Sequence, residues 1–141
     1  MERRRANDPP TRPLVLLVDG HDEALALYAI ALSAMGFNVT AAEDGAGAFR
    51  RACQLQPDII VTELMLRHAS GWDLLGQLKR DPRTHHIPVV VLTADARAVT
   101  LTRAMLEGSA ALLVKPCPPD QLAVELRDLL QFHGSRTRAS G

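Results

Sequence analysis

The chain has 141 residues, of which 47% are hydrophobic and 23% charged, so it is long enough for one globular domain and too short for two ordinary ones. Sixteen basic residues balance sixteen acidic ones, and the folded portion lacks the basic excess that is typical of a nucleic-acid-binding surface. The cysteines, Cys53 and Cys117, form no CxxC pair or disulfide framework, and no apolar run is long enough for a signal peptide or membrane span. These properties predict a cytoplasmic globular protein that contacts neither nucleic acid nor membrane.

The two ends of the chain differ in composition from its middle. Residues 1–13 contain three prolines and a cluster of charge without a hydrophobic period, so we expect a disordered leader. Residues 134–141 are small and polar and are predicted to form a flexible tail. Arginines gather at both ends, where a solvated tail is a simpler interpretation than contact with an anionic surface. The folded domain is therefore expected to span residues 14–133.

Strand-like apolar runs and helical periods alternate through this domain. In chain order we expect a strand at 14–18, a helix at 22–35, a strand at 37–41, a helix at 46–55, a strand at 59–62, a helix at 72–78, a strand at 89–93, a helix at 96–106, a strand at 112–114 and a helix at 119–132. The continuous apolar runs are typical of strands that are buried on both faces. Five strands alternating with five helices predict a doubly wound α/β fold with a parallel sheet and helices on both faces.

Polar residues stand where four of the expected strands end. They are Asp19, Glu63, Thr93 and Lys115. Each has a simpler explanation alone: Asp19 begins a turn with Gly20, Thr93 caps the next helix, and Lys115 is a solvated charge. A charge at Glu63, in an apolar stretch, needs a partner or a wet cavity. In a parallel sheet, ligands gather at the carboxyl ends of the strands, so together these residues predict a functional site.

The motifs around these strand ends are VLLVDG at 15–20, PDIIVTELML at 57–66, HIPVVVLTADA at 86–96 and GSAALLVKPCPP at 108–119. With this spacing, the chain from about 14 to 132 resembles the receiver domain of two-component response regulators. The resemblance implies a flavodoxin-like (βα)5 fold with strand order 2-1-3-4-5. It also implies a pocket in which an aspartate after the third strand accepts a phosphoryl group from a histidine kinase, beside a magnesium ion.

Carried over by position, the resemblance assigns a role to each strand-end residue. Glu63 falls on the phosphoacceptor, and Asp19 and Gly20 fall on the acidic pair that helps to hold magnesium. Thr93, followed by Ala94, falls on the hydroxyl residue that contacts the phosphoryl oxygens. Lys115 falls on the lysine that contacts the same oxygens.

Two departures from the family pattern lie in the pocket itself. Glu63 is longer than aspartate by one methylene, about 1.5 Å of bond path, and is expected to reach into the phosphoryl position and pair with Lys115. Gly20 supplies no carboxylate, so Asp19 and Glu63 are expected to bind magnesium weakly or not at all. The adjacent His21 is a poor magnesium ligand and is interpreted as a solvated residue or a helix start.

A third departure concerns the output side. Members of the family often carry a Tyr or Phe in the fifth strand, at the position of Leu112 here. A leucine cannot reproduce the inward and outward states of an aromatic ring with a polar tip. The three departures together predict a degenerate receiver that is not phosphorylated by the ordinary route.

The leading functional hypothesis is a single-domain regulatory module, not an enzyme, that acts through protein–protein contacts. Its partner would be a histidine kinase, another regulator, or a second copy bound through the fourth helix, fifth strand and fifth helix, a face expected to include Met105, Leu106 and Leu129. The alternative is a single-domain response regulator that a histidine kinase or a small acyl phosphate still phosphorylates, which retention of Asp19, Thr93 and Lys115 would favour.

A small enzyme on the same fold is a third alternative. It would use Cys117, or the adjacent His85 and His86, which have no third ligand at metal spacing. The sequence also lacks a glycine-rich nucleotide fingerprint. No cofactor is therefore expected beyond weakly bound magnesium.

Overall fold

The computed structural model describes residues 12–140, with side chains for residues 12–132. The strands are β1 (Leu14–Val18), β2 (Asn38–Ala42), β3 (Ile59–Thr62), β4 (Val89–Thr93) and β5 (Ala111–Val114). The helices are α1 (Asp22–Ala34), α2 (Gly45–Leu55), α3 (Gly71–Arg80), α4 (Ala98–Leu106) and α5 (Pro119–Ser140). Residues 1–11 of the predicted leader and Gly141 of the predicted tail lie outside the described residues.

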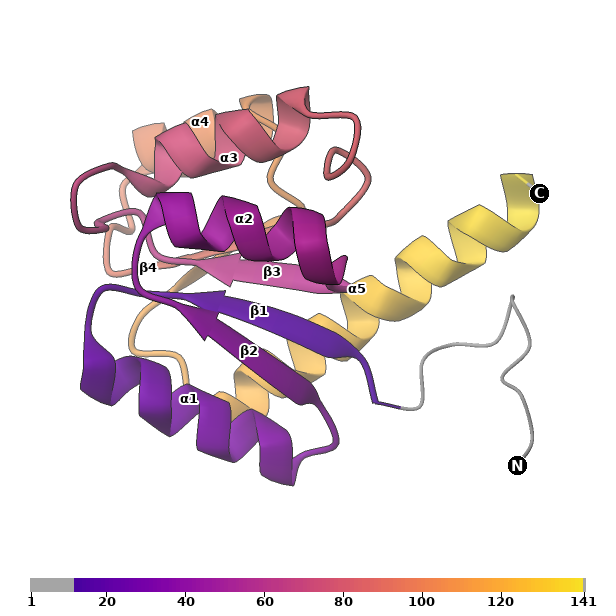
Figure 1. Ribbon diagram of the computed structural model, residues 1–141, viewed down its shortest axis with the longest axis horizontal. Coiled ribbons are helices and arrows are strands. Elements are labelled where there is room, and N and C mark those ends of the chain that lie inside the picture. The colour runs from indigo at the N-terminus through magenta and orange to yellow at the C-terminus, as the bar shows by residue number, and fades with distance from the viewer. Residues whose placement is uncertain (1–11, 141) are drawn as a thin grey trace.

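All neighbouring strands of the sheet are parallel, in the order β2-β1-β3-β4-β5. Helices α1 and α5 cover one face of the sheet, and α2, α3 and α4 cover the other (Figure 1). This arrangement confirms the predicted doubly wound fold and its strand order. Among residues 12–140, no helix is both long and apolar enough to span a lipid bilayer.

The sheet separates two hydrophobic clusters. The cluster under α1 and α5 contains Leu25, Leu32, Leu122 and Leu126, and the cluster under α2 and α3 contains Ala48, Ala52, Leu74, Leu75 and Leu78. Strand residues alternate between the two, so that Val15 and Leu17 face the first and Leu16 and Val18 face the second. The strands are therefore buried on both faces, which is why they are continuous apolar runs in the sequence.

Several predicted boundaries were wrong by one or two residues. Strand β2 begins at Asn38 because the amide of Phe37 is hydrogen-bonded to the carbonyl of Leu32 at the end of α1, so Phe37 is buried without joining the sheet. Helix α4 begins at Ala98, two residues later than expected, because Asp95 accepts hydrogen bonds from Arg97 in the loop before it.

Helix α5 continues to Ser140, past the end expected at residue 132. One interior glycine, Gly134, costs about 1 kcal/mol relative to alanine and does not by itself end a helix. The flexibility of residues 134–141 and the domain limits at 14 and 133 stay predictions. Leu129, expected on the exposed face of α5, instead packs against the core cluster under α1 and α5.

The junction between β3 and α3 leaves no room for a side chain at Gly71. A Cβ atom there would lie 2.3 Å from the carbonyl oxygen of Glu63 and 2.8 Å from the Cα of Leu64. The amide of Gly71 donates a 2.7 Å hydrogen bond to the carbonyl of Leu64, which fixes this approach. The start of α3 is thus held against the strand end that carries Glu63.

We expect Gly71→Ala to destabilise the fold by about 1–3 kcal/mol, since both atoms that the methyl group meets belong to the backbone. Gly76→Ala is the matched control in the same helix, because the added methyl group meets only the flexible end of Arg80. That control should be neutral or more stable than the wild type, by up to about 1 kcal/mol. Urea unfolding of both variants checks the prediction, which equal stabilities would contradict.

Candidate functional site

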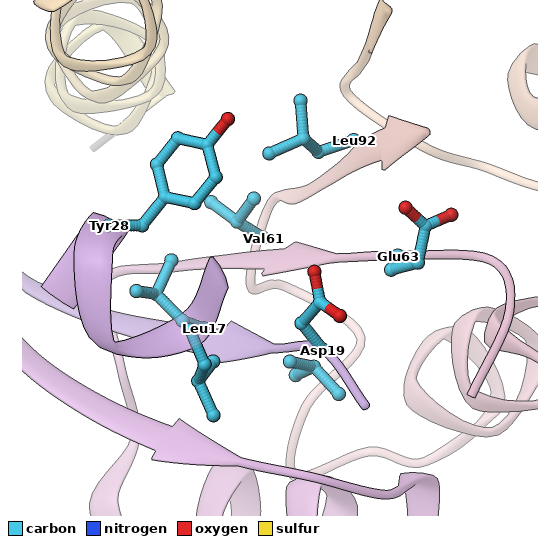
Figure 2. Close-up of a pocket in the computed structure, with 8 residues that line it drawn as sticks. Leu17, Asp19, Tyr28, Val61, Glu63 and Leu92 are labelled. Atoms are coloured by element: carbon cyan, nitrogen blue, oxygen red, sulfur yellow. The ribbon is translucent and has the colours of Figure 1, made fainter. Parts of the chain in front are cut away.

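Three charged residues directly follow strands at the carboxyl edge of the sheet. Asp19 follows β1, Glu63 follows β3 and Lys115 follows β5, while Thr93 is the last residue of β4. The carboxylates of Asp19 and Glu63 extend to the same side of the sheet (Figure 2). The sequence therefore located the polar edge correctly.

Lys115 is bound by both carboxylates. Its Nζ lies 2.9 Å from Oε2 of Glu63 and 3.1 Å from Oδ2 of Asp19. The side chains are only partly accessible to solvent, with exposed fractions of 23% for Lys115, 10% for Asp19 and 8% for Glu63. The predicted pairing of Glu63 with Lys115 is present, and Asp19 makes it a three-residue cluster.

The electrostatics of the cluster keep Lys115 protonated. Burial alone would lower the pKa of its ammonium group, but the hydrogen bonds to Glu63 and Asp19 outweigh burial, and the pKa is raised above its ordinary value. Two carboxylates and one ammonium leave a net charge of minus one at the strand ends. The ammonium of Lys115 therefore compensates the charge of only one of the two carboxylates.

The remaining carboxylate oxygens also have partners. Oε1 of Glu63 accepts a 2.8 Å hydrogen bond from the amide of Leu64. Oδ1 of Asp19 accepts one of 2.9 Å from the amide of His21 and lies 3.2 Å from its Nδ1. His21 is the N-cap residue of α1, in agreement with its interpretation as a helix start. Each of the four carboxylate oxygens of Asp19 and Glu63 therefore has a partner.

Apolar side chains line a pocket beside the two carboxylates, and Tyr28 borders it (Figure 2). The pocket is lined by Leu17, Val18, Asp19, Leu25, Tyr28, Val61, Glu63 and Leu92. The hydroxyl of Tyr28 donates a 2.7 Å hydrogen bond to the carbonyl of Cys117, and burial raises its pKa. Sequence reasoning missed Tyr28, although its spacing from Leu25 and Leu32 placed it near the inward face of α1.

Thr93 is directed toward the loop that leads to α4. Its hydroxyl accepts a 3.3 Å hydrogen bond from the amide of Asp95, and its carbonyl accepts one of 2.8 Å from the amide of Lys115. Asp95 is in turn held by Arg97 and by the hydroxyl of Thr100, and the hydrogen bonds with Arg97 hold its pKa well below the usual range. The hydroxyl is buried beside the cluster, but it is engaged with this loop.

The residues present do not fit the magnesium site that the resemblance implies. Among the side chains described, those of residues 12–132, no group of three His, Cys, Asp or Glu is arranged to hold a metal ion. Beside Gly20, where the family has a carboxylate, lies the side chain of Arg67, with its Cγ 3.6 Å from the position of a Cβ. The two carboxylates that are present, Asp19 and Glu63, already share the ammonium of Lys115.

The residues that we considered for a small enzyme are not brought to this cluster. His85 and His86 are exposed in the α3–β4 loop, where their rings contact each other edge to face. Cys117 is buried, and burial raises the pKa of its thiol, which disfavours the nucleophilic thiolate. Cys117 is connected to Tyr28 by its backbone carbonyl and not by its sulfur.

Fold and site together define a receiver-type signalling domain, and comparison with known proteins agrees. The response regulator receiver domain family matches residues 15–127. The chain belongs to this family.

Two curated relatives illustrate the similarity. The chain is 34% identical over 119 residues to the DNA-binding dual master transcriptional regulator RpaA of Synechocystis sp., which covers 84% of this chain and 49% of RpaA. It is 30% identical over 120 residues to the phosphate regulon transcriptional regulatory protein PhoB of Pseudomonas aeruginosa. This match covers 85% of this chain and 52% of PhoB. The chain thus spans about half the length of these relatives.

Solved structures show the same fold. The chemotaxis response regulator CheY4 of Vibrio cholerae superimposes with a TM-score of 0.79 at 23% identity, covering 84% of this chain and 99% of that one. The receiver domain of the Francisella response regulator 1452 gives a TM-score of 0.80 at 25% identity. This match covers 85% of this chain and 98% of that domain. These likenesses confirm the flavodoxin-like topology.

Proposed function

We propose that this receiver domain is a regulatory module that is not phosphorylated by the ordinary aspartyl route and acts through protein–protein contacts, without enzymatic activity of its own. The observation that carries the proposal is the closed ion cluster of Asp19, Glu63 and Lys115, in which Lys115 joins the two carboxylates. Fully partnered carboxylates in a site with little solvent are poor nucleophiles and poor metal ligands. The pairing of Glu63 with Lys115 then holds the domain in one conformation without a phosphoryl group.

Steric and electrostatic arguments support the same conclusion. Phosphoryl transfer depends on positioning, and a displacement of about 1 Å of a reacting atom can lower its rate roughly a hundredfold. Glu63 places its carboxylate about 1.5 Å of bond path beyond that of an aspartate. An incoming dianionic phosphoryl donor would also have to displace Glu63 from Lys115.

The surface of α4, β5 and α5 supports a role in protein contacts. Met105, Leu106 and Val114 are exposed there, and Leu106 has 83% of its surface accessible. Leu112 in β5 is half-buried, in place of the aromatic residue that couples pocket and surface in the family. Within this proposal the face binds a histidine kinase or another regulator in one fixed conformation.

A second candidate is a response regulator that is still phosphorylated, and one observation favours it. Thr93, Lys115 and Asp19 are all retained at the pocket, and Thr93 is linked through the amide of Asp95 to the loop before α4. A pocket with no remaining use for phosphate has no need of this hydroxyl.

Exposure to a small acyl phosphate and Mg²⁺ distinguishes the two candidates. We expect the wild-type chain to keep its mass, because Glu63 is held by Lys115 and the amide of Leu64. Intact-mass spectrometry provides the measurement. A phosphoryl adduct on the wild type that Glu63→Gln abolishes would support the phosphorylated regulator instead.

A further inference from the structure

Helix α1 is apolar on its outer face as well as on its inner one. Leu25 and Leu32 are buried against the sheet, yet on the opposite side Leu27 is 61% exposed and Ile30 is 71% exposed. No element packs outside this helix in Figure 1. A surface helix normally carries polar residues on its outer side, so this face lacks a partner in the isolated domain.

The outer residues of α1 have the spacing of a helix-pairing seam. Glu23, Leu27, Ile30 and Ala34 follow each other at intervals of four, three and four residues, which places them on one stripe. The flanking outer positions are the small residues Ala26 and Ser33. Small flanking residues allow a second helix to approach closely.

The neighbouring helix on the same face of the sheet is different. Helix α5 exposes two apolar side chains, Val124 and Phe132, each at 56%. Polar and charged residues are exposed along the same helix, among them Gln121, Arg127 and Asp128. Between Glu23 and the end of α1 there is no charged residue at all. The outer face of α1 is therefore uncharged between its ends, whereas the exposed face of α5 mixes apolar and charged residues.

Charge of opposite sign marks the two ends of α1. Asp22 and Glu23 form its first turn. At the other end, Arg127 donates a hydrogen bond to the carbonyl of Met35, and Arg12 donates one of 3.2 Å to the carbonyl of Ser33. Each guanidinium has five N–H donors, so both keep donors for a further carboxylate. One end of the face is acidic, the middle apolar, and the other end basic.

We propose that α1 is a homodimer interface, in which two copies pack their α1 helices antiparallel about a two-fold axis. Leu27 of each copy then packs on Ile30 of the other, and in the same register Glu23 lies opposite Ala34, next to the arginines. An isologous interface must be complementary to itself, and a face with opposite charges at its two ends meets that condition only when antiparallel. The helix of 13 residues is about 20 Å long, so hydrophobic and charged contacts all fit within it.

Residues 1–11 are another candidate occupant, because Arg12 lies at the basic end of the face. Apart from its prolines, this segment has Met1 and Ala6 as its apolar residues, and its charge is mostly arginine. It therefore supplies too few apolar side chains to cover Leu27 and Ile30. A second α1 supplies both the apolar residues and the opposite charges.

Sedimentation equilibrium of the full chain tests the proposal. The wild type is expected to dimerise, and Leu27→Glu to weaken the dimer at least tenfold. Leu55→Glu on α2 is the matched control, because Leu55 is another exposed leucine, at 48%, on a helix outside the proposed interface, and it should leave the dimer unchanged. Thermal unfolding should show both variants folded. A monomeric wild type, or a dimer that only Leu55→Glu weakens, would overturn the proposal.

A charge exchange tests the antiparallel register. Glu23→Arg and Arg127→Glu should each weaken the dimer, because each places like charges together across the two-fold axis. The two substitutions in one chain restore opposite charges between copies and should recover the dimer to within about threefold of the wild type. A double variant weaker than either single variant would contradict this register.

Discussion

The double variant Glu63→Asp, Gly20→Asp is expected to gain phosphorylation by a small acyl phosphate with Mg²⁺, roughly a hundredfold or more faster than the wild type. The shorter carboxylate withdraws from the phosphoryl position, and the second one restores a hard oxygen ligand for the metal. There is room for it, because a Cβ at Gly20 meets only ordinary contacts, the nearest at 3.6 Å. In the reaction a carboxylate oxygen bonds to phosphorus, and the bond from phosphorus to the acyl carboxylate breaks.

The single variants separate the two contributions. Glu63→Asp alone restores the acceptor aspartate, but it should react slowly because the second carboxylate for the metal is still missing. Gly20→Asp alone should not react at all, because Glu63 still occupies the acceptor position. The measurement is the rate at which intact mass shifts by one phosphoryl group, with and without Mg²⁺. If the double variant stays unreactive while folded, loss of the pocket residues is not what distinguishes this chain from its family.

Removing the cation from the cluster is expected to have the second large effect. Lys115→Met leaves the carboxylates of Asp19 and Glu63 facing each other with little solvent. Breaking a fully buried ion pair costs about 3–5 kcal/mol, and the partial exposure of Lys115 reduces this to an expected loss of about 1–3 kcal/mol at neutral pH. Adding Glu63→Gln to Lys115→Met should recover part of the loss, because it removes one of the two like charges.

The pH dependence of this loss has a definite sign. Because the folded pKa of Lys115 is raised above its ordinary value of 10.5, its contribution to stability is complete below that pH and disappears as the pH rises through the folded value. The difference in unfolding free energy between wild type and Lys115→Met should therefore be constant from neutral pH to about pH 10 and shrink above it. Urea unfolding across this range is the measurement, and a difference that grew with pH would contradict the ion cluster.

The fold could be predicted from the sequence because strands that are buried on both faces of the sheet are continuous apolar runs. Strands β1, β3 and β4 are continuous apolar runs, and their predicted limits are those of the structure. The start of helix α4 and the start of strand β2 were predicted less well. The hydrogen bonds of Asp95 and the burial of Phe37 set these two limits, and neither leaves a periodic signal in the sequence. Local chemistry thus decided the boundaries that periodicity could not.

In the site, too, some residues could be predicted from the sequence and others could not. The carboxyl-edge rule brought Asp19, Glu63 and Lys115 together, and the pairing of Glu63 with Lys115 followed from chain length and charge. Tyr28 was missed because its role depends on a contact with a backbone carbonyl 89 residues away. Gly71 was missed because its constraint is the absence of space beside the backbone of Glu63. Neither feature has a signature in a single sequence.

Treatment of the wild-type chain with a small acyl phosphate and Mg²⁺, followed by intact-mass spectrometry, tests the central claim most directly. The double variant Glu63→Asp, Gly20→Asp in a parallel sample shows that the reagent is active, and Glu63→Gln locates any adduct. The closed cluster of Glu63, Asp19 and Lys115 predicts an unchanged wild-type mass while the double variant is phosphorylated. A wild-type adduct that forms at the rate of the double variant and is lost in Glu63→Gln would contradict it.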